Sequence, residues 1–153
     1  MATYKLTDLD VWAKKIETRA ENIINKICFG MSDAVIEQTP AWRGKGILGG
    51  RARGNWQATL HAPAQGVLDL HDITGAAAKE KAKEVSNGAA GNVFYLTNNL
   101  PYIRVIEYGL YPQGAYKTER TKGGYSVQAP KGMVRIVARE FSRTVKEQVN
   151  KFK

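Results

Sequence analysis

The sequence predicts an α+β domain in which an antiparallel or mixed β-sheet is packed by a long N-terminal helix and a C-terminal helix. Three observations predict this class: a long helical periodicity near the start, short alternating segments in the middle, and a second helical periodicity at the end. A chain of 153 residues with 43% hydrophobic residues is long enough to bury one core. We therefore expect a single domain over residues 1–153.

The first helix is expected from about Thr7 to Gln38. Thr7 and Asp10 have the spacing of a capping box, and the restriction imposed by Pro40 ends the helix. Apolar residues follow at steps of three and four, namely Leu9, Trp12, Ile16, Ala20, Ile23, Ile27, Met31 and Ala34. Because so long a stripe is rarely exposed, we expect it to pack on the sheet, and Ile23→Ala to cost about 2–5 kcal/mol.

The middle of the chain alternates between loops and short elements. Residues 41–54 are rich in glycine and carry four basic residues but no acidic one, which predicts a mobile loop. Residues 55–61 and 92–97 alternate as half-buried strands do, and residues 66–70 are a weaker candidate. Residues 74–84 consist mainly of Ala, Lys and Glu, which favour a short, solvated helix.

The last third combines a short element, an insert and a final helix. The 102–108 segment fits either a helical turn or a strand, and we favour the helix. Residues 111–128 form a long insert, in which Gly123 and Gly124 are suited to a hairpin turn. Apolar spacing then predicts a helix from about Pro130 to Lys151, with Pro130 in its first turn. Along it, Arg135, Arg139, Arg143 and Lys146 form a stripe that is expected to be solvated.

No pattern of catalytic or metal-binding residues emerges. The two histidines, His61 and His71, match no zinc spacing, and the glycine-rich 43–50 segment lacks the order of a phosphate loop. The serines have no glycine elbow. We therefore expect no catalytic, cofactor-binding or metal-binding residues, no cofactor and no enzyme.

Cysteine content and hydropathy indicate a compartment. The single cysteine, Cys28, excludes an internal disulfide and is expected to be a small buried residue. No apolar run is long enough to span a bilayer, and the first residues lack the apolar centre of a secretory signal. These features predict folding in a reducing cytoplasm without a membrane partner.

The net charge of +9 is concentrated in the C-terminal part. Residues 1–102 carry 12 basic and 10 acidic side chains, whereas residues 103–153 carry 11 and 4. Basic residues of the 41–54 segment also lie beside Trp42 and Trp56, a pairing that single-strand nucleic-acid binders use. Against this, the alternation of residues 55–61 places Trp56 on the core face of its strand. The same basic loop is equally suited to an acidic protein surface, so sequence leaves both partners open.

Three further segments carry a family resemblance. They read Asn-Asn-Leu-Pro-Tyr-Ile-Arg-Val-Ile-Glu-Tyr-Gly at residues 98–109, Ala-Pro-Lys-Gly-Met-Val at 129–134, and Gly-Arg-Ala-Arg-Gly-Asn-Trp-Gln at 50–57, after Thr39-Pro40. Together they resemble the phage head–tail joining family, the tail-completion or neck proteins that include the minor tail protein Z type. Members typically carry a short Val-Asp-Thr link after Thr-Pro, which residues 41–49 replace here.

The resemblance implies a structural virion protein that joins tail to head, or completes the tail, as a closed ring. Six copies are the first expectation for that ring. Its partners would be further copies of itself and neighbouring neck and tail proteins. Whether genomic DNA also passes through the ring is left open by the sequence. It would reside at the virion neck or upper tail, and in the host cytoplasm during assembly. The alternatives are a basic nucleic-acid-binding accessory protein and a phage enzyme. The expected interface residues are Arg43, Arg51, Arg53, Tyr102, Tyr108, Lys117, Arg120 and Lys122.

Overall fold

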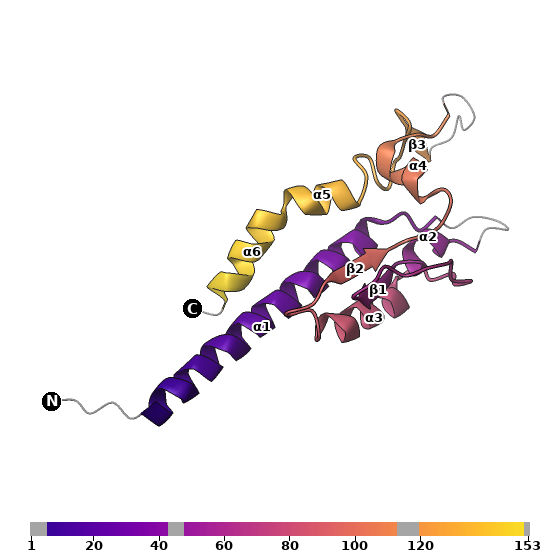
Figure 1. The fold of residues 1–153 in the computed structure, drawn as a ribbon. Coiled ribbons are helices and arrows are strands. Elements are labelled where there is room, and N and C mark those ends of the chain that lie inside the picture. Colours follow the sequence, from indigo (N-terminus) through magenta and orange to yellow (C-terminus); the bar gives the residue numbers. More distant parts are fainter. Residues whose placement is uncertain (1–5, 43–47, 113–119, 152–153) are drawn as a thin grey trace.

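A computed structural model describes residues 6–42, 48–112 and 120–151. The chain is built on one long helix, α1 (Leu6–Gln38), and a small α/β body lies around its C-terminal end (Figure 1). Two C-terminal helices, α5 (Val134–Arg139) and α6 (Phe141–Asn150), run back along α1. The predicted α+β class is confirmed.

The remaining elements are short. They are α2 (Arg51–Gly54), β1 (Gln57–Leu60), α3 (Ala76–Ser86), β2 (Phe94–Thr97), α4 (Ile103–Tyr108), β3 (Thr121–Lys122) and β4 (Tyr125–Ser126). Strands β1 and β2 pair antiparallel, with Gln57 opposite Thr97 and Leu60 opposite Phe94. Strands β3 and β4 form a separate antiparallel hairpin that turns at Gly123 and Gly124. The strands predicted at 55–61 and 92–97, the helix at 102–108 and the hairpin are therefore confirmed, with shorter bounds.

The hydrophobic core joins the last turns of α1 to the sheet and to α3. Ile36 is completely buried, and Trp56 and Ala58 lie beside it in the same cluster. Helix α3 contributes Ala78 and Ala82, whose small side chains let it lie close to β1. The prediction that the 74–84 helix is solvated is wrong for this face, because alanine periodicity gives no strong apolar signal.

Residues 66–70 form no strand, contrary to the prediction. Their backbone is bound instead by the buried side chain of Asn55, whose Oδ1 accepts a hydrogen bond from the Leu68 N–H at 2.7 Å. The Asn55 amide also donates to the Leu70 carbonyl at 3.4 Å. A side-chain amide thus replaces the strand ladder that alternation suggested. The expected 41–54 loop likewise ends in helix α2.

The expected single C-terminal helix is shorter and divided. It begins at Val134 instead of Pro130, because Gly132 has a φ of +84°, which no helical residue adopts. It is interrupted at Glu140, where α5 ends and α6 begins. Pro130 forms an isolated bridge with Gly132 and does not enter the first turn.

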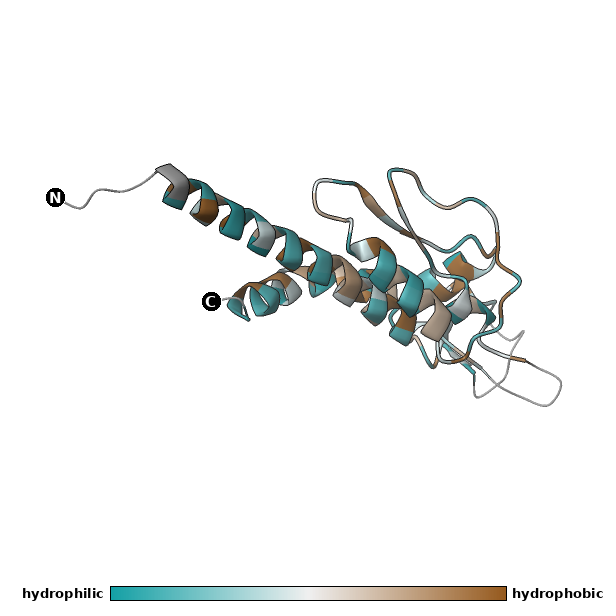
Figure 2. Ribbon diagram, turned by 90° about the horizontal axis from the view of Figure 1, so that it is seen from below, coloured by the Kyte–Doolittle hydropathy of each residue, from teal (hydrophilic) through white to brown (hydrophobic). Residues whose placement is uncertain are grey.

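The N-terminal half of α1 projects from the body, and this corrects the predicted packing of the first helix (Figures 1 and 2). Residues 8–22 are all exposed, and Trp12 and Ile16 are 63% and 45% exposed. Ile23 and Ile27 are half-buried. A helix of 33 residues is about 50 Å long, so the small body covers only its C-terminal part. None of the helices within the described ranges has the apolar length that a membrane crossing would need.

Candidate assembly interface

Arg53, one of the expected interface residues, holds the end of α1 in place. Its Nε donates to the Thr39 carbonyl at 2.8 Å, and its two Nη atoms donate to the Ile73 carbonyl at 2.8 Å and the Glu37 carbonyl at 2.9 Å. The last carbonyls of a helix have no partner within it, so the guanidinium satisfies groups that would otherwise need water. The charge of Arg53 is therefore engaged within the chain.

Trp56 is also committed to the interior. It is 5% exposed, and its Nε1 donates to Thr39 Oγ1 at 2.7 Å, while that hydroxyl donates to the Val35 carbonyl at 2.7 Å. A buried indole cannot stack on a nucleic-acid base. This confirms the prediction that Trp56 faces the core, and it removes Trp56 from the single-strand binding pattern.

A hollow of about 290 Å³ beside α2 and α4 brings several predicted residues together. We call it the aromatic–basic hollow; its lining includes Trp42, Leu48, Arg51, His71, Tyr102 and Tyr111. Arg51 is exposed and Tyr102 is 39% exposed. Burial raises the pKa of the Tyr102 phenol, and the nearby charge of Arg51 acts in the opposite direction. Arg51 and Tyr102, which lie 51 positions apart in the sequence, thus share one surface.

Trp42 connects this hollow to the β3–β4 hairpin. The Arg120 guanidinium lies 5.4 Å from the centre of the Trp42 ring, within reach of a cation–π contact. The Trp42 Nε1 donates to Ser126 Oγ at 3.4 Å. Lys122 is exposed on β3. Arg51, Tyr102 and Arg120 therefore contribute to one continuous aromatic and basic region, whereas Arg43 and Lys117 lie outside the described residues.

Tyr108 belongs to a second cluster, centred on the buried carboxylate of Glu107. The Oε2 atom of Glu107 accepts hydrogen bonds from the N–H groups of Met133 at 2.7 Å and Val134 at 3.0 Å. Its Oε1 accepts from the backbone N–H of Arg135 at 3.0 Å and from Nε of the same residue at 3.1 Å. Glu107 thus caps the N-terminus of α5 from 26 residues away in sequence.

Electrostatics and aromatic packing reinforce this cluster. Burial acts to raise the pKa of Glu107, but the three backbone N–H groups and Arg135 outweigh it, and the pKa lies below its ordinary value. The Arg135 guanidinium also lies 5.0 Å from the centre of the Tyr108 ring and donates to Tyr125 Oη at 3.2 Å. Arg135 therefore makes specific contacts within the chain, contrary to the prediction that its stripe is only solvated.

Tyr108 remains half exposed although Arg135 lies over its ring. Gly109 ends helix α4 with a φ of +67°, and its N–H donates to the Val105 carbonyl, as expected for a residue that fixes the end of this segment. Sequence reasoning missed Glu107 as a structural centre. Its signal was a lone carboxylate among apolar residues in Ile-Glu-Tyr, which must find a partner when buried.

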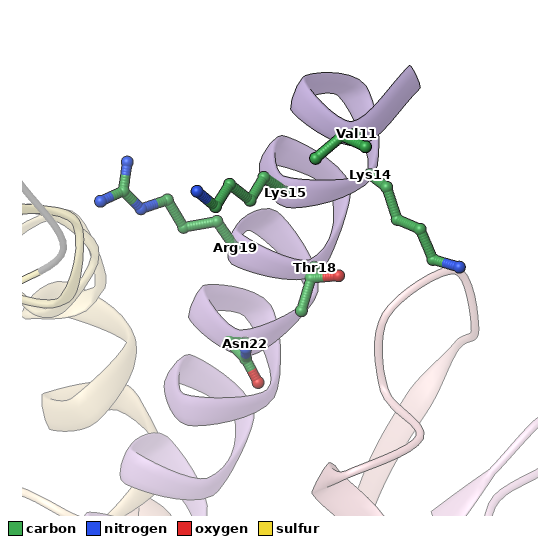
Figure 3. A pocket seen from close by; sticks show the side chains of 6 residues that line it. All are labelled: Val11, Lys14, Lys15, Thr18, Arg19 and Asn22. Atoms are coloured by element: carbon green, nitrogen blue, oxygen red, sulfur yellow. The ribbon is translucent and has the colours of Figure 1, made fainter. Parts of the chain in front are cut away.

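The projecting half of α1 offers a third surface. A shallow hollow of about 380 Å³ on it is lined by Val11, Lys14, Lys15, Thr18, Arg19 and Asn22 (Figure 3). All six side chains come from one helix, so this hollow has no opposing wall that could enclose a small molecule. On this projection, Leu9, Val11 and Trp12 are each more than half exposed.

Within the described ranges, no group of three or more His, Cys, Asp or Glu side chains is placed to hold a metal ion. His71 Nδ1 lies 3.0 Å from the Gly49 carbonyl, and His61 is exposed with a φ of +68°. Comparisons of the chain with models of known protein families, with curated proteins and with solved structures found no match. The resemblance to the phage head–tail joining family therefore remains a prediction.

Proposed function

We propose that this chain is a structural protein of tailed-phage virions that joins tail to head, or completes the tail, as a closed ring at the neck. One observation carries the proposal: an amphipathic helix projects from the body with large apolar side chains uncovered, among them Leu9 at 56%, Trp12 at 63% and Ile16 at 45% exposure. The choice of virion and neck rests on the resemblance of residues 50–57, 98–109 and 129–134.

A projecting helix of this kind is expected to be stabilised by a partner. Isolated helices of fewer than about 12–15 residues are marginal in water, and most helical stability in proteins comes from packing of the apolar face. Contiguous exposed apolar surface on a folded protein commonly marks a contact with another macromolecule. Assembly is therefore the function that best accounts for the energetic cost of leaving this half of α1 uncovered.

The aromatic–basic hollow supplies a second surface for assembly. Tyrosine and arginine are enriched at protein contacts, and Arg51, Tyr102 and Arg120 offer both, together with a positive charge that suits an acidic neighbour. Two different contact surfaces on one subunit are what a head-to-tail ring requires. Neighbouring neck or tail proteins would then bind the faces that the ring leaves free.

A basic nucleic-acid-binding accessory protein is the second candidate. Exposed Arg51 and Lys122 and a net charge of +9 favour it. Phosphate contacts release counterions, so such binding would weaken steeply with added salt. Binding of free DNA that follows this salt dependence would support the second candidate over the first.

The proposed function is tested by native mass measurement and electron microscopy of the purified full chain, together with its deletion from the phage genome. We expect closed rings from the protein, and full heads and complete but unattached tails from the deletion phage. Joined virions in the absence of the protein would overturn the proposal. Restoration by the wild-type chain controls for effects on neighbouring genes.

A further inference from the structure

An apolar groove of about 540 Å³ lies between the C-terminal half of α1, strand β2 and the start of α5. We call it the α1–β2 groove. The side chains that matter for its chemistry are Cys28 and Met31 on α1, Val93, Phe94 and Leu96 at β2, and Val134 on α5. Two polar side chains also line it, and both are satisfied locally: Ser32 Oγ donates to the Cys28 carbonyl at 2.8 Å, and the Asn92 amide donates to the Gly88 carbonyl at 2.8 Å. The groove therefore presents almost only apolar groups.

The rim of this groove is uncovered. Val93 is 58% exposed, and Ile24 and Val134 are each 42% exposed. These residues belong to three separate segments of the chain, so the exposure is a shared property of the groove and not of one loop. This groove and the stripe formed by Leu9, Trp12 and Ile16 on the projecting half of α1 are thus both apolar surfaces open to solvent.

We propose that these two surfaces bind each other between copies of the chain, with the Leu9–Trp12–Ile16 stripe of one subunit seated in the α1–β2 groove of the next. The inference rests on the ring of the proposed function and names the contact that would build it. It assigns the second copy, and not an apolar small molecule, as the occupant of the groove.

The spacing of the stripe fits this mode of binding. Leu9, Trp12 and Ile16 stand at i, i+3 and i+7, the positions through which an amphipathic helix anchors in an apolar groove. A small molecule could fill a volume of this size, but it would leave the stripe uncovered. A second copy covers both surfaces at once.

The stripe cannot reach the groove of its own subunit. Leu9 and Cys28 belong to the same continuous helix, and the 19 residues between their positions correspond to about 28 Å along its axis. A straight helix cannot fold back on itself, so any contact must be made between chains. Because stripe and groove are different surfaces, repeated contacts form a closed ring where the rotation between neighbouring subunits closes, and an open filament where it does not; a reciprocal pair closes at two chains.

A disulfide trap tests the contact directly. The chain has a single cysteine, Cys28, and it lines the groove, so Ile16→Cys places the only other thiol on the stripe. Within one subunit these positions are about 18 Å apart along the helix, far beyond the roughly 7 Å between Cα atoms that a disulfide tolerates. Oxidation at alkaline pH, which offsets the effect of burial in raising the pKa of the Cys28 thiol, should therefore link separate chains.

Two matched variants control for chance collisions. Val11→Cys carries the thiol on a residue as exposed as Trp12 but about 200° around the helix from Leu9, away from the stripe. The double variant Ile16→Cys with Cys28→Ser removes the groove thiol. We expect interchain disulfides for Ile16→Cys that map to position 28, and at least tenfold less of that product from Val11→Cys.

Native mass measurement of the same proteins separates this inference from the proposed function. Trp12→Ala should weaken self-association at least about tenfold, as loss of an aromatic anchor does. The trapped product together with closed rings supports both; the trapped product in two-chain particles supports the contact but overturns the ring. Rings that persist in Trp12→Ala without the disulfide overturn the contact and leave the ring intact. A chain that stays monomeric and forms no disulfide at the highest attainable concentration overturns the contact.

Discussion

The two ends of α1 differ in whether their side chains have partners within the chain. At the C-terminal end, the hydroxyl of Thr39, the indole of Trp56 and the guanidinium of Arg53 all have partners within the chain. At the projecting end, Leu9, Trp12 and Ile16 leave most or nearly half of their surface in water. Among the described residues, Ser86 Oγ is the one buried side-chain polar atom without a hydrogen-bond partner.

The difference follows from two free-energy costs: that of leaving a buried polar group unpaired and that of leaving an apolar side chain in water. A buried polar group without a partner loses about 1–3 kcal/mol, and later binding of another subunit cannot easily reach it. An uncovered apolar side chain forgoes about 25 cal/mol per Å², and a partner can supply that burial at any time. A subunit built for assembly can therefore postpone apolar burial but must satisfy its internal polar groups alone.

The largest effect on the stability of the free subunit is expected at the C-terminal end of α1. Ile36 is fully buried, so Ile36→Ala should lower the free energy of unfolding by about 4 kcal/mol through lost burial and the cavity left behind. Denaturant titration of the monomeric subunit measures this. A loss of less than about 1 kcal/mol would show that the core collapses around the smaller side chain.

Removing the Glu107 charge should cost somewhat less. Glu107→Gln replaces a carboxylate that accepts from three backbone N–H groups and Arg135 with an amide that can satisfy only part of them. We expect a loss of about 2–3 kcal/mol in the free energy of unfolding. Glu140→Gln is the matched control, because its ion pair with Arg143 is exposed and should contribute below about 1 kcal/mol. Equal effects of the two substitutions would contradict the capping role.

The same carboxylate predicts a pH dependence. The pKa of Glu107 in the folded chain lies below its ordinary value of 4.5, so its contribution is present above that pH and is lost as the pH falls through the folded pKa. The difference in unfolding free energy between wild type and Glu107→Gln should therefore shrink in acid below about pH 4.5. Unfolding curves over a pH series measure it, and a constant difference would rule out titration of this group as the cause.

Ile23 lies at the transition between the two regions and should show an intermediate effect. The stripe alone predicted a loss of about 2–5 kcal/mol for Ile23→Ala, but the side chain is only half-buried. We now expect about 1 kcal/mol in the free subunit. A larger loss would mean that α6 or another element covers this part of α1 more fully in solution.

The smallest effect on folding is expected at the projecting end. Trp12→Ala should change the unfolding free energy of the monomeric subunit by no more than about 0.5 kcal/mol, because the side chain is mostly in solvent. The same substitution should reduce self-association, which ultracentrifugation across a concentration series detects. A large loss of monomer stability would instead place Trp12 in a fold contact within the subunit.

Local patterns were sufficient for much of the architecture. The helical periodicity and Thr39-Pro40 predicted α1 to its last residue, Gln38, and to within one residue of its start, and alternation predicted both paired strands. Gly123 and Gly124 predicted the β3–β4 turn. These features depend on neighbours within a few residues, where backbone preference and side-chain spacing act directly.

Local sequence patterns predicted the candidate interface only in part. Sequence predicted Arg51, Tyr102 and Arg120 as surface residues, but only the fold brings them around Trp42 and the aromatic–basic hollow. It gave no sign that Arg53 would bind three carbonyls. Such contacts join residues 14 to 20 positions apart, and no local period encodes them.

The sequence by itself determined which side chains of α1 form an apolar stripe, and the tertiary structure alone decided which part of that stripe is covered. Periodicity follows from the geometry of a single helix, so it can be read without knowledge of the rest of the chain. Burial depends on what else packs there, and the elements beyond α1 cover its C-terminal part while residues 8–22 remain exposed. The capping of α5 by Glu107 was decided in the same way, because a carboxylate finds its N–H donors only after the chain has brought them together.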